Sequence, residues 1–456
     1  MTAYDLAVLG GGPGGYATAL RAAGHGLRVA IIEGDKVGGT CLHRGCVPSK
    51  ALLHVAHLAD SLPLLVDLGL ARYGRGLDPA AAGGFRDGVV DQLHRGLEHL
   101  LGTKGIDTVR GWGTVVAPGE VAVDGTGPIR ARHVVVATGS VAVDLPSSTH
   151  DGHVVMWSDD ALRLERVPPS AVVVGGGAIG VELASLWRSL GSEVTILEAS
   201  ERLLPLEDPD SSRALTDGFA RRGIDVRTST GTAEVRRSED GAVVETTEGD
   251  LLHAPVVLVA VGRRPATATT GLAELGVLDE RGHVVTDLLG RTSIEGLWAV
   301  GDVRPTLALA HAAFAEGFVV ADAIVGGDPE PVDYDLVPRV TYCDPEVASV
   351  GLTEPRAREV HGEGLTITST TFAENARALI EGATGMVKLL TASDGTVVGA
   401  HVVGPSATEL IGELGLATSW EALASEVGAV VHAHPSLAEA VRETAFAAAG
   451  TPFHSR

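Results

Sequence analysis

The 456-residue sequence predicts an α/β fold with two Rossmann-like domains, followed by a smaller α+β domain at the C-terminal end. The prediction rests on a strand, a glycine-rich turn, a helix and a second strand ending in glutamate, a pattern that occurs twice. From about Pro338 the glycine turns stop, and short strands alternate with helices. A chain of this length also exceeds what one hydrophobic core usually supports, so several domains are expected.

Composition excludes several classes of function. The formal net charge of −23 argues against nucleic acid or an anionic membrane as partner, because both need a basic surface. No apolar run approaches the roughly 18 residues of a membrane span, and a strand beginning at Tyr4 leaves no room for a targeting peptide. Three cysteines do not make an extracellular disulfide framework, and the sequence predicts no metal site. We expect a cytoplasmic enzyme.

The first pattern runs from a strand through the turn Gly10–Gly15 into an alanine-rich helix. In such a turn Gly10 permits the sharp bend, Gly12 lets the backbone approach a pyrophosphate, and Gly15 lets helix and strand pack closely. The pyrophosphate would rest on the helix N-terminus. The next strand ends at Glu33, whose carboxylate would bind ribose hydroxyls, so the pattern predicts a bound dinucleotide.

The second pattern repeats the first, with the same spacing between the last glycine and the acid. Gly175, Gly177 and Gly180 form its turn, and the strand after the helix ends at Glu198. Two complete patterns predict two dinucleotides in one chain. A carboxylate at Glu198 would accept a hydrogen bond from the 2′-hydroxyl of NAD and repel the 2′-phosphate of NADP, so NAD is favoured. Arg202 is close to Glu198 in the sequence and could attract that phosphate, but we expect its side chain to face solvent.

Cys41 and Cys46 follow the first pattern, and their spacing alone is compatible with either a working dithiol or two inert buried residues. On a regular helix their Cα atoms would be roughly 8–9 Å apart, whereas a disulfide tolerates about 4.4–6.8 Å. Bridging therefore needs a break in the helix, which Gly45 permits. Pro48 suits an early helical position, so Cys46 is expected near a helix N-terminus, where a thiolate is favoured.

The remaining elements are predicted from periodicity, with domain boundaries placed at 1–145, 146–265, 266–335 and 336–456. The strand at 292–302 ends in Asp302, and an acid at a strand end in an α/β sheet lies where ligands bind. A loop and a short helix are expected at 146–166. Further helices are expected at 50–62, 87–101, 311–324, 354–361 and 406–420, and further strands at 107–123, 132–140, 256–261, 339–343, 366–372, 386–390 and 397–403.

The last domain ends in a segment with two histidines, His432 and His434. An imidazole titrates in the range needed for proton transfer at neutral pH, so His434 is a candidate base, and His432 is expected to be structural. Pro435 suits the first position of a following helix, on which Glu439 could orient the His434 ring.

The glycine turns, the cysteine pair, the strand ending in Asp302 and the C-terminal histidine segment resemble motifs of the disulfide-reducing flavoenzymes, and they occur in the same order. The resemblance is greatest to the dihydrolipoyl dehydrogenases. The segment Gly38–Lys50 is similar to that family's redox segment, Gly175–Glu182 to its NAD turn, and His432–Glu439 to its base segment. The resemblance covers essentially the whole chain, and it implies an FAD-binding domain, an NAD-binding domain and a C-terminal dimerisation domain.

The resemblance implies that the first pattern binds FAD and the second binds NAD. Asp302 would then contact the ribitol chain of the flavin. The implied FAD residues are Gly10, Gly12, Gly15, Glu33, Thr40, Thr138, Gly139, Asp302, Ala310 and His311, and the implied NAD residues are Gly175, Gly177, Gly180, Glu198 and Gly262.

The resemblance also implies a division of labour between the thiols. Cys46 would lie nearer the flavin, and Cys41 would be the more exposed thiol that exchanges with dihydrolipoamide. His434, assisted by Glu439, would deprotonate the substrate thiols, whose reference pKa is about 8.5. A second implied pair, Lys50 and Glu182, is expected to form an ion pair near the reacting rings.

The implied reaction is NAD-dependent oxidation of dihydrolipoamide by a homodimer in which the base reaches the disulfide of the other subunit. The implied partner is the lipoyl domain of a 2-oxo acid dehydrogenase or glycine cleavage complex. Four positions depart from the family pattern: His43 and Arg44 replace Asn-Val or Asn-Ile beside the thiols, Ala266 replaces a common asparagine, and Ala312 replaces a lysine.

Two alternatives compete with this interpretation. The first is a related NADPH-dependent disulfide reductase, which Glu198 opposes. The second is a non-enzymatic component of a larger complex, which the intact set of two thiols and a C-terminal base opposes. Cys343 has no cysteine near it in the sequence and is expected to be a small buried residue on its strand.

Overall fold

The computed structural model describes residues 4–67, 78–145, 147–148 and 150–454. The chain divides into two compact units, one formed by residues 1–52, 80–143 and 262–334 and the other by residues 53–79, 144–261 and 335–456. Residue 146, where we placed a boundary and the start of a connection, lies outside the described residues, and the four boundaries stay predictions. The fold class is the expected one. The first unit contains one Rossmann-like sheet, and the second unit contains the other together with the C-terminal α+β domain.

The central strand of the first unit, β1 (Tyr4–Leu9), pairs in parallel with β2 and β6. Leu6 and Val8 join one buried cluster and Ala7 and Leu9 join another, so both faces of the strand are covered. This explains why its sequence is a continuous apolar run and does not alternate. The other strands of this unit are β2 (Val29–Glu33), β3 (Asp107–Arg110), β4 (Gly113–Ala117), β5 (Glu120–Val123), β6 (Thr126–Val136), β7 (Ser140–Ala142), β16 (Arg263–Pro265) and β17 (Leu297–Ala299).

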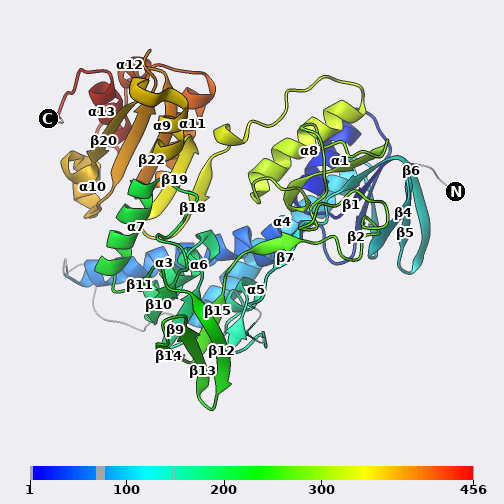
Figure 1. The fold of residues 1–456 in the computed structure, drawn as a ribbon, viewed down its shortest axis with the longest axis horizontal. Helices are drawn as coiled ribbons and strands as arrows, with labels where there is room; N and C mark the ends of the chain where they lie inside the picture. Colours follow the sequence, from blue (N-terminus) through cyan, green and yellow to red (C-terminus); the bar gives the residue numbers. More distant parts are fainter. Residues whose placement is uncertain (1–3, 68–77, 146, 149, 455–456) are drawn as a thin grey trace. The chain divides into compact units, whose positions relative to one another are not determined.

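Two helices cover one face of this sheet, α1 (Pro13–Gly24) and α8 (Ala310–Ile324), which lie side by side (Figure 1). Their small residues let the two helices approach closely: a Cβ atom on Gly317 would lie 2.9 Å from the carbonyl oxygen of Gly14. The sheet order β3-β2-β1-β6, with β17 paired to β6, places the carboxyl ends of the parallel strands at one edge. The remaining helices here are α2 (Gly39–Arg44), α3 (Cys46–Asp67, shared with the second unit), α4 (Pro79–Thr103) and η1 (Gly301–Val303).

The second unit repeats the parallel sheet in the order β11-β10-β9-β15-β8. A three-stranded antiparallel sheet, β12-β13-β14, packs beside it through a shared apolar cluster. The elements are β8 (Val155–Met156), α5 (Ser158–Ala161), β9 (Ser170–Val174), α6 (Ala178–Ser189), β10 (Glu193–Leu197), α7 (Pro209–Arg221), β11 (Asp225–Arg227), β12 (Thr232–Ser238), β13 (Gly241–Thr246), β14 (Leu251–Ala254) and β15 (Val256–Val259).

The C-terminal part of this unit is an antiparallel sheet in the order β18-β19-β22-β21-β20, with helices packed on a core of small and branched residues. Its elements are η2 (Tyr334–Leu336), β18 (Arg339–Thr341), β19 (Glu346–Gly351), α9 (Glu354–His361), η3 (Gly362–Gly364), β20 (Thr366–Thr371), η4 (Phe372–Glu374), α10 (Ala376–Glu381), β21 (Met386–Thr391), β22 (Val397–Gly404), α11 (Ala407–Ser419), α12 (Ala424–Ala429) and α13 (Glu439–Ala448).

Several elements differ from the sequence-based expectation. Helix α3 begins at Cys46 and α4 at Pro79, both earlier than expected. Helix α7 and strand β19 were not predicted, because the buried face of α7 contains few large apolar residues, Leu215 and Phe219 among serines and a glycine, and β19 is a run of only six residues. Strand β18 ends at Thr341, so Cys343 lies in the loop after it, although it is buried as expected.

A buried ionic cluster joins α7 to the C-terminal sheet within the second unit. The Nζ atom of Lys388, on β21, donates to Asp208 at 2.8 Å, to Asp210 at 2.7 Å and to Glu354 at 2.6 Å. The side chains of Lys388 and Asp208 are fully buried. All three ammonium hydrogens therefore have acceptors, which is the condition under which a buried charge is tolerated. Asp208 also caps α7 by accepting from the backbone N–H of Asp210.

We predict that Lys388→Met destabilises the second unit, because it leaves the buried carboxylate of Asp208 without its cation. The expected loss is about 3–5 kcal/mol, measured as a shift of the urea unfolding midpoint. The control is Arg213→Met, which removes an exposed partner of Asp210 and should cost about 0–1 kcal/mol. Equal effects of the two substitutions would contradict the assignment.

The same cluster gives a pH dependence with a defined sign. Burial acts to raise the pKa of Asp208, but the His401 charge and the hydrogen bonds from Lys388 and two backbone N–H groups outweigh burial and lower it. The Lys388 hydrogen bond likewise lowers the pKa of Glu354. A lowered carboxyl pKa means that its stabilisation is present above the ordinary range near pH 4 and is lost as the pH falls below it. Lys388→Met removes this lowering, so the stability lost in the variant should shrink as the pH falls through the range in which Asp208 and Glu354 gain protons, measured as the difference between the urea midpoints of the two proteins at pH 7 and about pH 4.

Candidate active site

The redox segment consists of two helices separated by one glycine. Helix α2 contains Cys41, and α3 begins at Cys46, with Gly45 between them. A Cβ atom on Gly45 would lie 3.1 Å from the carbonyl oxygen of Thr40, so the break needs a small residue. The expected interruption of the helix is confirmed, and Cys46 lies at a helix N-terminus, where the dipole favours a thiolate.

Both cysteines are thiols in the structure, and they interact with each other. A hydrogen bond to Cys46, burial and the neighbouring Cys46 charge raise the pKa of Cys41, while the charge of Lys50 acts in the opposite direction. Cys46 is exposed and Cys41 is half-buried. The assignment of Cys41 to exchange with the substrate and of Cys46 to the flavin stays a prediction.

The two basic residues inside the redox segment have partners of their own on other parts of the unit. His43 Nε2 lies 2.9 Å from the carbonyl oxygen of Val37, and its ring packs edge-on against His94 on α4. Burial lowers the pKa of His43, so it is uncharged at neutral pH. Arg44 forms an ion pair with Asp35 at 3.2 Å. These residues therefore anchor α2 and do not bring two positive charges to the sulfur atoms.

The first glycine turn has the geometry that its sequence predicts. Gly10 has a φ of +105°, and a Cβ atom there would lie 2.3 Å from the carbonyl oxygen of Ala137. A Cβ atom on Gly15 would lie 1.9 Å from the carbonyl oxygen of Gly10. Gly12 caps α1 and leaves the first helical turn open for a phosphate.

The redox segment packs directly on this turn. The N–H of Gly38 donates to the carbonyl oxygen of Gly11 at 2.7 Å. A Cβ atom on Gly39 would lie 2.7 Å from the Cα of Gly12, so two glycines meet where the chains touch. The structure therefore brings the two thiols and the first dinucleotide turn into one site.

The two acids close their turns in the same way. Glu33 accepts from the N–H groups of Gly11 and Asp35 at 2.7 and 2.8 Å. Glu198 accepts from the N–H groups of Gly176 and Ser200, both at 2.6 Å. Each carboxylate keeps unused lone pairs for ribose hydroxyls. The repeated spacing in the sequence thus corresponds to a repeated hydrogen-bond pattern.

The other residues assigned to FAD lie around the first turn or at the edge of its sheet. Thr138 follows β6, and its hydroxyl is buried without a hydrogen-bond partner among the described residues. Asp302, in η1, accepts from the Ser140 hydroxyl at 2.5 Å. A buried polar atom without a partner beside a turn with an open helix end fits a dinucleotide. Thr40 lies in α2, Gly139 precedes β7 with a φ of +72°, and Ala310 and His311 begin α8.

The second glycine turn, assigned to NAD, has the same backbone geometry as the first. Gly175 has a φ of +109°, and a Cβ atom there would lie 2.4 Å from the carbonyl oxygen of Ala260. A Cβ atom on Gly180 would lie 1.9 Å from the carbonyl oxygen of Gly175, and Gly177 caps α6. Gly262 has a φ of +129°.

Two further residues near this turn have defined surroundings. Glu182, on α6, is buried and accepts from the N–H of Tyr342 at 3.0 Å. Arg202, expected to face solvent, is half-buried and donates to the carbonyl oxygen of Pro205 at 3.0 Å. The ion pair between Lys50 and Glu182 stays a prediction.

The candidate base and its partner are adjacent in the second unit. His434 Nδ1 lies 3.0 and 3.2 Å from the two carboxylate oxygens of Glu439. Burial acts to raise the pKa of Glu439, but the N–H of Ser436 and the imidazole outweigh it and lower that pKa, which keeps the carboxylate ionised. His432 bonds Glu413 at 2.8 Å and the carbonyl oxygen of Val430 at 2.9 Å, in agreement with a structural role.

One expectation about the base segment is wrong. Pro435 is not the first residue of a helix, because α13 begins at Glu439. The four residues from Pro435 to Ala438 form a turn instead, and Leu437 in that turn packs against the core of the domain. The proline rule describes local preference, and here the packing of the turn decides where the helix starts.

Sequence reasoning missed two polar groups at the site. Burial, followed by the charges of Cys41 and Cys46, raises the pKa of Tyr16 to about 12, which places a neutral hydroxyl near the thiols. Arg263 donates to the hydroxyl and the carbonyl oxygen of Ser140, both at 2.7 Å, and so supports the residue that bonds Asp302. Both residues stand in segments already assigned to other roles, and a partner distant in sequence leaves no local signal.

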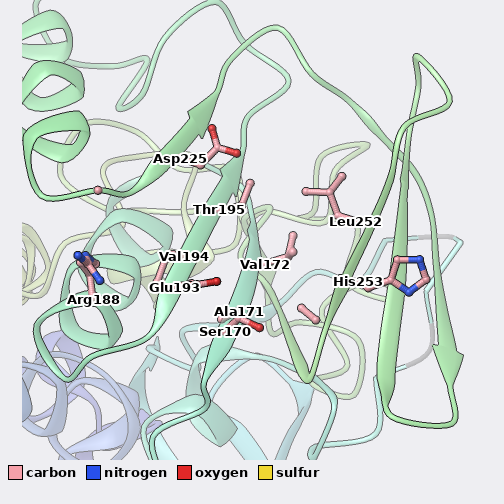
Figure 2. Close-up of a pocket in the computed structure, with 12 residues that line it drawn as sticks. Ser170, Ala171, Val172, Arg188, Glu193, Val194, Thr195, Asp225, Leu252 and His253 are labelled. Atoms are coloured by element: carbon pink, nitrogen blue, oxygen red, sulfur yellow. The ribbon is translucent and has the colours of Figure 1, made fainter.

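The second unit contains a cavity of about 550 Å³, whose lining residues are drawn in Figure 2. Its lining includes Ser170, Glu193 and Asp225, the first residues of β9, β10 and β11. The glycine turn follows the last residue of β9, at the opposite edge of the sheet. Because nucleotides bind at the carboxyl ends of parallel strands, this cavity is not the dinucleotide site.

The described residues show no helix that is long and apolar enough to cross a membrane. Among the same residues, no group of three or more histidine, cysteine, aspartate or glutamate side chains could hold a metal ion.

Comparison with known proteins agrees with this geometry. Residues 4–317 match the family described as pyridine nucleotide-disulphide oxidoreductase, and residues 337–445 match its dimerisation domain. The chain belongs to this family. The resemblance inferred from the motifs is therefore confirmed.

Relatives and solved structures cover nearly the whole chain. Dihydrolipoyl dehydrogenase from Bacillus subtilis is 36% identical, covering 99% of each chain. The crystal structure of LpdA from Mycobacterium tuberculosis has a TM-score of 0.90 at 27% identity, covering 98% of this chain and 99% of that one. The Cu(II) complex of the HOCl-induced flavoprotein disulfide reductase RclA from Escherichia coli has a TM-score of 0.87 at 27% identity, covering the same shares.

Proposed function

We propose that this chain oxidises dihydrolipoamide to lipoamide and reduces NAD to NADH, with FAD bound at the first glycine turn. The observation that carries the proposal is the packing of the Cys41–Cys46 segment on that turn. A dithiol beside a dinucleotide turn, with a second turn for NAD in the same chain, has the parts that this reaction needs. When bound, the flavin would pass the electron pair of the dithiol on to NAD as a hydride.

The chain's own residues carry out the thiol chemistry. With Cys41 and Cys46 joined as a disulfide, a substrate thiolate attacks the Cys41 sulfur, and Cys46 leaves as a thiolate. The second substrate thiolate then attacks the mixed disulfide, which releases lipoamide and leaves both cysteines reduced. The two substrate protons need an acceptor, and His434, paired with an ionised Glu439, is the group proposed for this role.

The working form is proposed to be a homodimer in which His434 serves the thiols of the other subunit. The His434 side chain is 73% exposed, so a second chain can reach it. Apolar side chains are exposed just before it, with Val431 at 90% and Val430 at 53%. Trp420 and Leu416 on the same domain are also exposed. Apolar residues gathered in a domain of the dimerisation family are typical of an interface.

The proposed protein partner is the lipoyl domain of a 2-oxo acid dehydrogenase or glycine cleavage complex, and the proposed compartment is the cytoplasm, where thiols stay reduced. The similarity to RclA supports a second candidate, an NADPH-dependent disulfide reductase. Glu198 opposes it, because a carboxylate beside the adenosine ribose repels a 2′-phosphate.

Steady-state kinetics with purified holoenzyme test the reaction. We expect turnover of dihydrolipoamide with NAD and at least about tenfold lower kcat/KM with NADP, because losing a hydrogen bond to a charged group is worth about 1.5 kcal/mol or more. Glu198→Ala should reduce this preference, and Glu193→Ala, at the other end of β10, should not. Efficient reduction of glutathione-like disulfides by NADPH would overturn the proposal in favour of the second candidate.

Sedimentation velocity tests the homodimer. Val431→Glu places a charge on the exposed apolar segment, so we expect dissociation to monomers and loss of dihydrolipoamide turnover. Leu288→Glu is the control, because this leucine is 71% exposed in the other unit and lies outside the residues that match the dimerisation domain. A Val431→Glu protein that stays dimeric and active would contradict the proposed interface.

A further inference from the structure

The turn that carries the base is held by a residue far away in the sequence. Asn375 is only 8% exposed and stands between η4 and α10. Its side-chain Nδ2 donates to the carbonyl oxygen of Ser436 at 3.0 Å. Ser436 is two residues after His434, and its N–H donates to a carboxylate oxygen of Glu439 at 3.0 Å.

Asn375 is itself fixed by four hydrogen bonds. Its Oδ1 accepts from the N–H of Ala378 at 2.9 Å and so caps α10. Its backbone N–H donates to the carbonyl oxygen of Phe372, and its backbone carbonyl oxygen accepts from the N–H of Leu379, both at 3.0 Å. Only one orientation of the amide satisfies both the Ala378 N–H and the Ser436 carbonyl, so the side chain cannot rotate without losing bonds.

Glu439 is the residue through which this anchoring reaches the base. Within the described chain, the hydrogen bonds of the His434 ring go to the two oxygens of Glu439. An exposed imidazole loses rotational freedom only where such a partner holds it. Ser436 is held on its carbonyl side by Asn375 and on its N–H side by Glu439, so the position of the carboxylate depends on the position of the Ser436 peptide groups.

We propose that Asn375 is a positioning residue for the base, acting through Ser436 and Glu439 on the orientation of His434. The inference rests on the proposed function, in which His434 accepts the substrate protons. Asn375 does not touch the substrate. It keeps the turn at 434–439 in the conformation that aims the imidazole, and small misplacements of a catalytic group lower rates steeply.

Asn375→Asp is the sharpest variant, because it keeps the oxygen that caps α10 and removes the donor to Ser436. We expect kcat for dihydrolipoamide oxidation to fall by about 10- to 100-fold. The rate of NADH oxidation by ferricyanide should be unchanged, because that reaction needs neither the base nor the dithiol. The matched control is Thr371→Val, which removes the cap of the neighbouring η4, where the Thr371 hydroxyl accepts from the N–H of Ala373 and not from the turn. An Asn375→Asp enzyme with wild-type kcat would overturn the proposal.

A double-mutant cycle separates positioning from a general structural effect. If Asn375 acts through Glu439, adding Asn375→Asp to Glu439→Gln should lower kcat by less than about twofold further. A merely structural loss would multiply the two effects. Full multiplicativity would therefore contradict the proposal even if the single variant is slow.

Hydrogen exchange keeps the inference testable if the proposed reaction fails. Should wild-type holoenzyme not turn over dihydrolipoamide, the proposed function falls by itself. The contribution of Asn375 to the stability of the turn can then be measured as the rate of amide hydrogen exchange in the segment 434–439. This rate should be at least about tenfold higher in Asn375→Asp than in the wild type and in Thr371→Val. Equal exchange in all three proteins would refute it.

Discussion

The Cα atoms of Gly12 and Gly39 approach so closely that no larger residue fits at Gly39, and a backbone hydrogen bond joins the neighbouring Gly38 and Gly11. This contact between the redox segment and the first dinucleotide turn is the constraint on which the proposed chemistry depends. A thiol pair can exchange electrons with a bound ring system only if the two are held together. The glycines make that possible without any side chain between them.

Each dinucleotide turn is also closed by its own acid. Glu33 and Glu198 each accept from one N–H of the turn before them and from the N–H two residues after them, so the carboxylate is oriented before any ribose arrives. Preorganisation of this kind lowers the entropic part of binding. In the same way, His434 is oriented by Glu439, and we infer that Glu439 is oriented through Asn375. Each functional group thus depends on a partner held by the backbone.

Much of the fold could be predicted because its signals are local. The glycine turns, the apolar strands before them and the acids after them lie within about thirty residues of one another in each pattern, and the break at Gly45 followed from disulfide geometry. The start of α13 depends on the packing of Leu437. The Lys388 cluster and the Asn375–Ser436 bond join residues far apart in sequence, and neither leaves a periodic trace.

In the proposed enzyme, Cys41 and Cys46 form a second redox centre beside the flavin. Anaerobic titration of the oxidised holoenzyme with dithionite tests it most directly, because the number of electrons taken up per flavin counts the redox centres. We expect four electrons per flavin for the wild type, two for the ring and two for the disulfide, and two for Cys46→Ser with its flavin still bound. Uptake of only two electrons by the wild type would contradict it.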